Sequence, residues 1–397
     1  MWKNIQPAPA DAILGLTEAF KKDENPKKIN LGVGVYKDES GNTPVLQSIK
    51  AAEKQLVEKQ QTKSYLPISG DPKYAQQVQS LLFGVESESI FQRARTVHTP
   101  GGTGALRIGA DLLKKFNPEA TVWVSSPTWA NHKGIFTAAR FEIKEYAYYN
   151  PATRALDFTA LCETLKAVPA GDIVLLHVCC HNPTGVDPSQ EEWKTIVRIA
   201  QEKGWIPFLD FAYQGFGDSV EADRFPLSLF AGAGIDFLVA SSFSKNLGLY
   251  NERTGALTLV APSKEEADVA FTHLKKTIRV NYSNPPAHGG LAAATVLADE
   301  TLHAEWLKEL AAMRDRIKAM RNALVDGLAA RGVEQDFSFI RDQRGMFSFS
   351  GLSPEAVLWL KENRSIYIVG SGRINVAGLT PSNIDFICDA IAEVLKK

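Results

Sequence analysis

Short apolar runs alternate with longer helical patterns through the middle of the chain. Five of these runs are predicted strands, and they cover residues 121–125, 143–147, 173–178, 206–211 and 236–242. Strands that alternate with helices in this way are typical of a mostly parallel, doubly wound sheet in an α/β fold. In such sheets, ligands bind at the carboxyl ends of the strands. The pattern therefore directs attention to the polar residues that follow each run.

The two ends of the chain predict a second, smaller α/β domain. The N-terminal part holds a helix over residues 12–22, capped by Asp11, and a short strand over residues 29–36. The C-terminal part holds a long helix over 301–331, strands near 337–340, 346–350 and 366–369, and a final helix over 381–396. We expect an N-terminal arm (1–12), a small domain (13–47 and 314–397) and a large domain (48–313).

Composition places the chain among ordinary globular proteins. Of its 397 residues, 45% are hydrophobic and 22% are charged, and the net charge is -1. No basic stripe predicts a nucleic-acid partner, and no apolar run reaches the ~18 residues that span a membrane. The first ten residues lack the apolar core of a secretory signal. Four cysteines without a disulfide-like spacing favour a reducing compartment, which we interpret as the cytoplasm.

A lysine follows the fifth predicted strand in small polar company. Lys245 is a candidate for forming a Schiff base, because it comes just after a buried run. Ser242, Ser244 and Arg253 supply donors that suit a phosphate group. A solvated loop that happens to contain lysine and arginine is the alternative. An imine-forming lysine beside phosphate donors indicates pyridoxal phosphate.

Other strand ends carry residues that fit the same cofactor. Glycines 101, 102 and 104 lead into a helix that extends to about Phe116, and a helix N-terminus suits phosphate. The dinucleotide fingerprint is absent, because Arg107 stands where its third glycine would be. A structural glycine cap is the alternative. His177 and His181 lie on a strand and a turn, so buried histidines satisfied by their neighbours are favoured, and we expect no metal site.

The candidate residues provide each group that pyridoxal phosphate needs from a protein. They are Lys245 for the imine, Asp210 for the pyridine nitrogen, Tyr213 and Asn182 for the ring oxygen O3′, Gly102, Thr103, Ser242, Ser244 and Arg253 for the phosphate, Trp129 for ring stacking, and Arg373 for a substrate carboxylate.

Six motifs carry a resemblance to a known family. The chain resembles the class I aminotransferases of pyridoxal-phosphate fold type I, and within them the bacterial aspartate-specific members, from about residue 5 to the C-terminus. The motifs are Ser-Phe-Ser-Lys-Asn (242–246), Asn-Glu-Arg-Thr-Gly (251–255), Cys-His-Asn-Pro-Thr-Gly (180–185), Asp-Phe-Ala-Tyr-Gln-Gly (210–215), Asn-Tyr-Ser-Asn-Pro-Pro (281–286) and Ser-Gly-Arg-Ile-Asn-Val-Ala-Gly (371–378).

The resemblance implies a role for each site residue. Lys245 would hold the cofactor and move the proton of the substrate's α-carbon, and Asp210 would pair with the ring nitrogen, supported by His132. The other implied roles are O3′ contacts from Asn182 and Tyr213, phosphate contacts from Arg253, Ser242, residues 102–103 and the partner subunit's Tyr65, α-carboxylate contacts from Arg373, Asn182, Trp129 and Gly34, and binding of a second substrate carboxylate by the partner subunit's Arg279. The resemblance thus implies a homodimer with shared active sites.

The implied reaction is reversible amino transfer from L-aspartate to 2-oxoglutarate by a ping-pong mechanism. Val35, Lys37, Thr43, Thr103 and Asn284 follow the aspartate-type pattern, whereas Ser64 replaces the usual asparagine and leaves aromatic side activity open.

Several alternatives to this reaction remain. One is a tyrosine-type aromatic aminotransferase. Another is a lyase or synthase of the same fold, which need not keep Arg279. A regulator would need a basic helix-turn-helix extension, for which residues 1–30 leave no room, and the missing third glycine disfavours a nicotinamide oxidoreductase.

Overall fold

A computed structural model describes residues 2–6, 12–85 and 87–396. The chain divides into two compact units. Unit 1 comprises Met1–Thr43, Pro183–Gly185 and Arg316–Lys397, and unit 2 comprises Pro44–Asn182 and Val186–Asp315. The expected arm lies partly outside the described residues, as does the helix cap expected at Asp11. The functional division into small and large domains stays a prediction.

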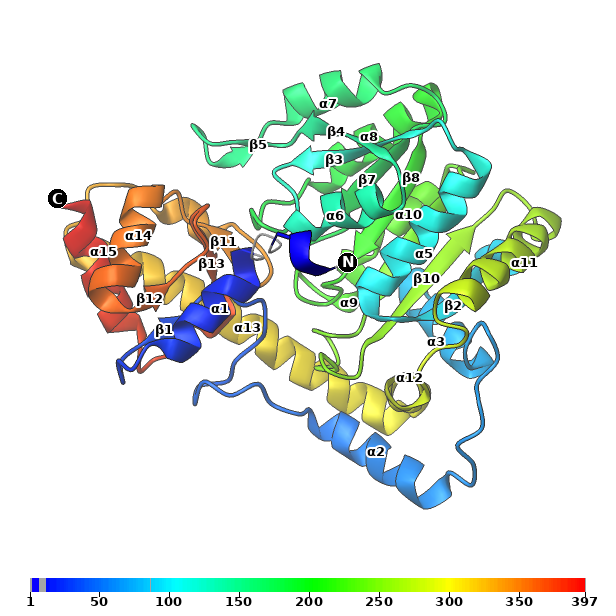
Figure 1. Ribbon diagram of the computed structural model, residues 1–397, viewed down its shortest axis with the longest axis horizontal. Helices are drawn as coiled ribbons and strands as arrows, with labels where there is room; N and C mark the ends of the chain where they lie inside the picture. Colours follow the sequence, from blue (N-terminus) through cyan, green and yellow to red (C-terminus); the bar gives the residue numbers. More distant parts are fainter. Residues whose placement is uncertain (1, 7–11, 86, 397) are drawn as a thin grey trace. The chain divides into compact units, whose positions relative to one another are not determined.

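Unit 2 is built on one seven-stranded sheet (Figure 1). Its strands, in spatial order, are β2 (Ala94–Pro100), β10 (Thr254–Val260), β9 (Phe237–Ser242), β8 (Ile206–Phe211), β7 (Ile173–His177), β3 (Thr121–Ser126) and β4 (Glu142–Ala147). The five strands from β9 to β4 are mutually parallel, and β10 runs antiparallel to both of its neighbours. The predicted α/β fold with a mostly parallel sheet is confirmed.

Helices flank this sheet. Those of unit 2 are α2 (Gln47–Lys59), α3 (Pro72–Phe83), α4 (Glu88–Arg93), α5 (Gly101–Phe116), α6 (Ala130–Ala138), α7 (Phe158–Ala167), α8 (Gln190–Lys203), α9 (Val220–Asp223), α10 (Phe225–Gly232), α11 (Lys264–Asn281), α12 (Ala287–Ala298) and the first half of α13 (Glu300–Ala330). A small ribbon of β5 (Tyr149–Asn150) and β6 (Ala155–Leu156) completes the unit.

The main core of unit 2 lies where α5 packs on the sheet. Helix α5 contacts β9 and β10, and its buried Leu106 and Ile108 join Phe208 and Leu257 in one apolar cluster. A Cβ at Gly109 would lie 2.4 Å from the Phe208 ring, so glycine is needed for this close approach. This packing holds α5 on the sheet. The helix begins at Gly101, within the glycine run singled out in the sequence.

Unit 1 contains two small sheets and the helices around them. Its elements are η1 (Trp2–Asn4), α1 (Ala12–Lys22), β1 (Ile29–Asn30), the second half of α13, η2 (Ser338–Arg341), β11 (Phe347–Phe349), α14 (Pro354–Arg364), β12 (Ile366–Tyr367), β13 (Arg373–Asn375), η3 (Val376–Gly378) and α15 (Ile384–Leu395). β1 pairs in parallel with β12, and β11 pairs antiparallel with β13.

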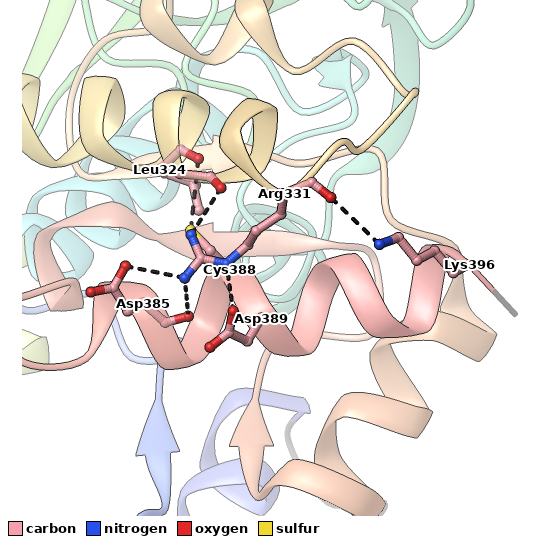
Figure 2. Close-up of polar contacts among 7 residues, drawn as sticks. Leu324, Arg331, Asp385, Cys388, Asp389 and Lys396 are labelled. Carbon is pink, nitrogen blue, oxygen red and sulfur yellow. Dashed lines mark hydrogen bonds and ion pairs between the residues drawn. The ribbon is translucent and has the colours of Figure 1, made fainter.

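An arginine connects α13 to α15 within unit 1 (Figure 2). Arg331 donates from Nε to Asp389 at 2.6 Å and from Nη2 to Asp385 at 3.1 Å. The Sγ atom of Cys388 lies on the same helix, 3.8 Å from the Leu324 carbonyl oxygen. Because the two carboxylates are exposed, each ion pair contributes at most about 1 kcal/mol.

Two predicted elements differ from the structure. The strand expected near 337–340 is wrong: Ser338 bonds through its amide and hydroxyl to Asp336, and these local bonds give the 3-10 helix η2 instead. The strand expected over 29–36 ends at Asn30, because the Asn375 side chain takes the carbonyl oxygens of Val33 and Val35. Every helix in the described part of the chain is too short or too polar to span a membrane.

Candidate functional site

The strand ends of unit 2 bring the predicted cofactor residues to one edge of the sheet. Pro100 at the end of β2 pairs with Thr254, and Ser242 at the end of β9 pairs with the adjacent Gly255. Asp210, near the end of β8, is in register with His177 at the end of β7. These positions belong to neighbouring strands, so their side chains are available to a single ligand.

Lys245 lies just past β9 and close to the predicted tyrosine. Its Nζ atom is 4.7 Å from the centre of the Tyr213 ring. Removal of the amine from water lowers the pKa of Lys245 to about 8; the Asp210 carboxylate opposes this shift and the Arg253 guanidinium assists it. A larger fraction of the amine is therefore neutral, and hence nucleophilic, near neutral pH than for a solvated lysine.

Asp210 is a buried carboxylate with a defined partner. Its Oδ2 atom is 2.9 Å from Nε2 of His132, whose Nδ1 atom is 2.8 Å from the Thr128 hydroxyl oxygen. Burial alone would raise the pKa of Asp210, but the hydrogen bond from His132 and the nearby Lys245 ammonium outweigh it, so the pKa is lowered. Asp210 is thus a carboxylate anion near the end of β8, a strand whose other residues are apolar.

Two further histidines pack behind this acid. His181 has its Nε2 atom 2.9 Å from the Ser125 hydroxyl oxygen and stacks on Tyr148, as expected for a satisfied buried histidine. His177 differs from the prediction, because neither ring nitrogen finds a hydrogen-bond partner among the described residues. Burial and the neighbouring His132 lower the pKa of His177 to about 3, so its ring is neutral. The donor atoms of His132, His177 and Asp210 lie within 4.8 Å of one another.

The glycine run and the lysine segment form a cradle of donors. A Cβ at Gly101 would lie 2.6 Å from Nη2 of Arg253, and one at Gly102 would lie 3.1 Å from Cβ of Ser242. Arg253 itself has a φ of 53° and approaches the Ser244 hydroxyl at 3.5 Å. Only backbone fits between the guanidinium and the start of α5. The amides of Gly102 and Thr103 occupy the first turn of that helix, where N–H groups are free to bind an anion.

The segments that carry Lys245 and Tyr213 are joined by residues that the sequence analysis missed. The Asn246 side chain donates to the Gln214 carbonyl at 3.3 Å, and the Trp306 indole donates to the Asn246 carbonyl at 2.7 Å. All three side chains are buried. They fix the spacing between the lysine and the tyrosine, and no local motif marks Trp306 as their partner.

Asn182 stands at the end of a strained turn. Cys180 has a φ of 54°, and the amides of Cys180 and His181 donate to the Asp187 carboxylate at 2.7 and 2.8 Å. These bonds hold the turn after β7 and leave Asn182 buried at its end. Trp129, at the start of α6, is half-buried and meets the His132 ring edge-on at 5.2 Å. It therefore lies next to the histidine that contacts Asp210, and its stacking role stays a prediction.

Two of the predicted residues are exposed in unit 2. Tyr65 is 91% exposed, and Arg279 at the end of α11 is exposed and donates to the Ser283 hydroxyl. Their loops are tied together, because the Asn284 side chain donates to the Leu66 carbonyl at 3.1 Å. Neither residue belongs to the buried cluster around Lys245.

Arg373 and Gly34 meet within unit 1. Arg373 is buried on β13, donates to the Gly32 carbonyl at 2.6 Å and lies 4.1 Å over the Phe347 ring. A Cβ at Gly34 would lie 2.6 Å from the same ring. Asn375, two residues further along β13, holds the Val33 carbonyl. The predicted carboxylate-binding arginine is therefore fixed against the segment that contains Gly34.

Known proteins match this chain over its whole length. Residues 26–391 match the family described as aminotransferase class I and II. The aspartate aminotransferases of Salmonella typhi and Escherichia coli (strain K12) are each 54% identical over 396 residues, which is 100% of this chain and of each relative. The crystal structure of a Burkholderia pseudomallei aromatic-amino-acid aminotransferase covalently bound to pyridoxal phosphate has a TM-score of 0.97 at 49% identity, covering 100% of this chain and 99% of that one. The resemblance carried by the motifs is confirmed, and the chain belongs to the class I and II aminotransferase family.

Proposed function

We propose that this transaminase is a pyridoxal-phosphate-dependent aspartate aminotransferase, which exchanges amino groups between L-aspartate and 2-oxoglutarate. The observation that carries the proposal is the arrangement around Lys245, an amine of lowered pKa beside Tyr213 and Asp210. The names of the relatives at 54% identity support aspartate as the substrate.

The chain's residues fit pyridoxal phosphate. The cradle of Gly101, Gly102, Ser242, Ser244 and Arg253 brings donors for a phosphate together, because Cβ atoms at the two glycines would crowd Arg253 and Ser242. The Oδ2 atom of Asp210 is occupied by His132, and no described residue donates a hydrogen bond to Oδ1. The second oxygen is therefore available to a protonated ring nitrogen. Tyr213 and Asn182 would contact the ring oxygen, and Trp129 would cover one face of the ring.

When bound, the cofactor supplies an electron sink next to the substrate's α-carbon. The charge of Asp210 would favour a proton on the ring nitrogen, and the hydrogen bond from His132 keeps that carboxylate ionised. Lys245 would accept the α-proton of the substrate and later donate it, as a general base and then a general acid. The Tyr213 hydroxyl would orient the ring oxygen. Asn246 and Trp306 keep the lysine in reach by anchoring its loop.

Substrate choice is assigned to two arginines. Arg373 would bind the α-carboxylate, since a guanidinium grips both oxygens of a carboxylate. Arg279 would bind the second carboxylate of aspartate or 2-oxoglutarate. Tyr65 and Arg279 are exposed within the chain, and we infer that each completes the site of a second copy in a homodimer with two shared sites.

A spectroscopic titration tests the proposal. The purified protein should be yellow, L-aspartate should bleach its visible band, and 2-oxoglutarate should restore it. Aromatic amino acids form a second arm, because the matched solved structures include aromatic-amino-acid aminotransferases. We expect phenylalanine to react more slowly than aspartate. A colourless protein, or a band that aspartate leaves unchanged, contradicts the assignment.

Arg279→Asp should cut kcat/KM for aspartate by about 10³-fold or more, because a charged contact becomes a repulsion. Activity with phenylalanine should fall much less, since that side chain carries no charge. Steady-state kinetics with both substrates measure the difference. Arg198→Asp on the exposed face of α8 is the matched control and should leave both rates unchanged. Equal losses with both substrates would remove Arg279 from its assigned role.

The same variant tests the shared site. Mixing Arg279→Asp chains with Lys245→Ala chains should restore part of the aspartate activity, because each mixed dimer contains one site with both native residues. Mass spectrometry of the intact dimers confirms exchange. If mixed dimers form and remain inactive, Arg279 and Lys245 serve the same subunit's site.

The lowered pKa of Lys245 has a direct chemical test. In cofactor-free protein, cyanate should modify Lys245 with a midpoint near pH 8, whereas solvated lysines titrate at about 10.4. Asp210→Asn should move this midpoint down, because the carboxylate stabilises the ammonium. Arg253→Gln should move it up, because the guanidinium destabilises the ammonium. Peptide mass spectrometry across the pH range reads both shifts, with exposed Lys318 as internal reference. Coincident curves for the two lysines would refute the prediction.

A further inference from the structure

A cavity of about 630 Å³ lies within unit 1, and its lining includes residues of α1, β1 and α15. Its size falls in the range of small-molecule pockets, which is about 300–1,000 Å³. The described residues that line it are Phe20, Pro26, Lys27, Lys28, Ile29, Asn30, Lys37, Ser40, Gly41, Gly378, Thr380, Ser382, Asn383 and Phe386. We call this the basic cavity, because its lining contains three lysines and no carboxylate.

Two of the three lysines are not engaged elsewhere. Lys28 donates to the carbonyl oxygens of Phe20 and Asp23 at 2.9 and 2.6 Å. Within the described residues, the ammonium groups of Lys27 and Lys37 make no hydrogen bond and no ion pair. The nearest acid on the same loop as Lys37 is Asp38, whose Oδ1 atom accepts from the amides of its own turn. The lining therefore offers two ammonium groups that no carboxylate of the lining pairs with.

Hydroxyl groups also line the cavity. The hydroxyls of Thr380 and Ser382 lie 2.9 Å apart and share one hydrogen bond, so they can turn toward a stronger acceptor. The hydroxyl of Ser40 has no partner among the described residues. The lining also has an apolar part, which includes the half-buried ring of Phe386 and the side chain of Ile29. A ligand that fits this lining has an anionic head and an apolar body.

We propose that the basic cavity binds a small phosphate monoester with an apolar or aromatic body. The phosphate would lie between the ammonium groups of Lys27 and Lys37 and the hydroxyls of Ser40 and Ser382. The body would lie against Phe386. This site consists of unit 1 residues alone and uses none of the residues assigned to binding the cofactor or the substrate carboxylates, although Lys37 also belongs to the aspartate-type pattern.

The donor set favours phosphate over carboxylate. Planar, bidentate arginine contacts are the usual means of recognising carboxylates, and no arginine lines the cavity. Lysine acts instead as a point charge and suits phosphate, which carries about -1.5 to -2 charge at pH 7 and three acceptor oxygens. The volume exceeds what an inorganic phosphate ion would fill. An organic ester satisfies both the charged and the apolar parts of the lining.

Calorimetric titration of the cofactor-loaded enzyme with phenyl phosphate tests the proposal. Loading the cofactor first fills the cradle at the start of α5, so that phosphate site cannot contribute. We expect one binding event per chain. Lys27→Gln and Lys37→Gln should each weaken it by about tenfold, since a hydrogen bond to a charged group is lost. Inorganic phosphate and benzoate should each bind more weakly than the ester, because one lacks the body and the other lacks the dianion.

A matched pair of substitutions separates specific binding from general charge. The cavity pair is the double variant Lys27→Gln with Lys37→Gln. The control pair, Lys318→Gln with Lys361→Gln, removes an equal number of positive charges from unit 1 outside the cavity and should leave the affinity unchanged. Ser382→Phe, which places a ring in the cavity mouth, should block binding without removing charge. The proposal is overturned if the wild-type enzyme does not bind phenyl phosphate. It is also overturned if the control pair weakens binding as much as the cavity pair, or if benzoate binds as tightly as the ester.

Discussion

Lys245→Ala should nearly abolish amino transfer while the cofactor still binds. A positioned general base contributes about 10²- to 10⁴-fold to a rate, and this lysine is also the group that we propose to hold the cofactor covalently. Retention is expected because the cradle of Gly101, Gly102 and Arg253, together with Asp210, is untouched. The loss should appear in kcat rather than in cofactor content.

Single-turnover absorbance spectroscopy measures this prediction. The variant should carry a full complement of cofactor, released only on denaturation, and should convert aspartate at a rate lower by several orders of magnitude. Lys318→Ala is the control, since that side chain is exposed on α13. Turnover of Lys245→Ala near the wild-type rate would mean that another group moves the proton.

Asp210→Asn should be almost as damaging, although it only replaces one carboxylate oxygen with an NH₂ group. The substitution keeps the shape of the side chain and removes the negative charge to which we assign the proton on the ring nitrogen. A loss of about 10³-fold corresponds to about 4 kcal/mol in the barrier. Because the carboxylate's pKa is lowered in the wild-type chain, this charge is present throughout the neutral pH range. We therefore expect a loss that does not recover at any pH near neutrality.

The control for this variant removes the partner instead of the charge. In His132→Leu, which has no donor, the buried acid loses the hydrogen bond that lowers its pKa, so its pKa should rise. The activity of His132→Leu should then fall at the acid end of its pH profile and approach a plateau at higher pH. If Asp210→Asn gives the same pH-dependent profile, the charge of Asp210 is not the decisive property.

The sequence predicts best those site residues whose position follows from the local secondary structure. Asp210 and Lys245 follow apolar runs, and a parallel sheet brings such ends to one edge. The glycine run before α5 was likewise visible from its residue types. Arg279 and Tyr65 were assigned through the family resemblance, and only the structure adds that both are exposed.

Features that depend on distant partners were not predictable in this way. Trp306 anchors Asn246 across a long stretch of chain, and no pattern links the two. His177 looked like a satisfied histidine, but its strand neighbours present no acceptor to it. The turn bonds of Asp336 overrode the apolar run that suggested a strand near 337–340. In each case tertiary or side-chain contacts decide what local preference leaves open.

The position of β10 has a consequence for how this chain matures. β10 is inserted between β2 and β9, and its first residues bring Arg253 against the glycines that follow β2. Strand pairing across such a long stretch of sequence is slow, because the entropy of closing the loop opposes it before any contact compensates. During synthesis, the cradle can close only after β10 has emerged from the ribosome. A nascent chain therefore cannot capture its cofactor until most of unit 2 is made, and capture then stabilises the last strand to enter the sheet by mass action.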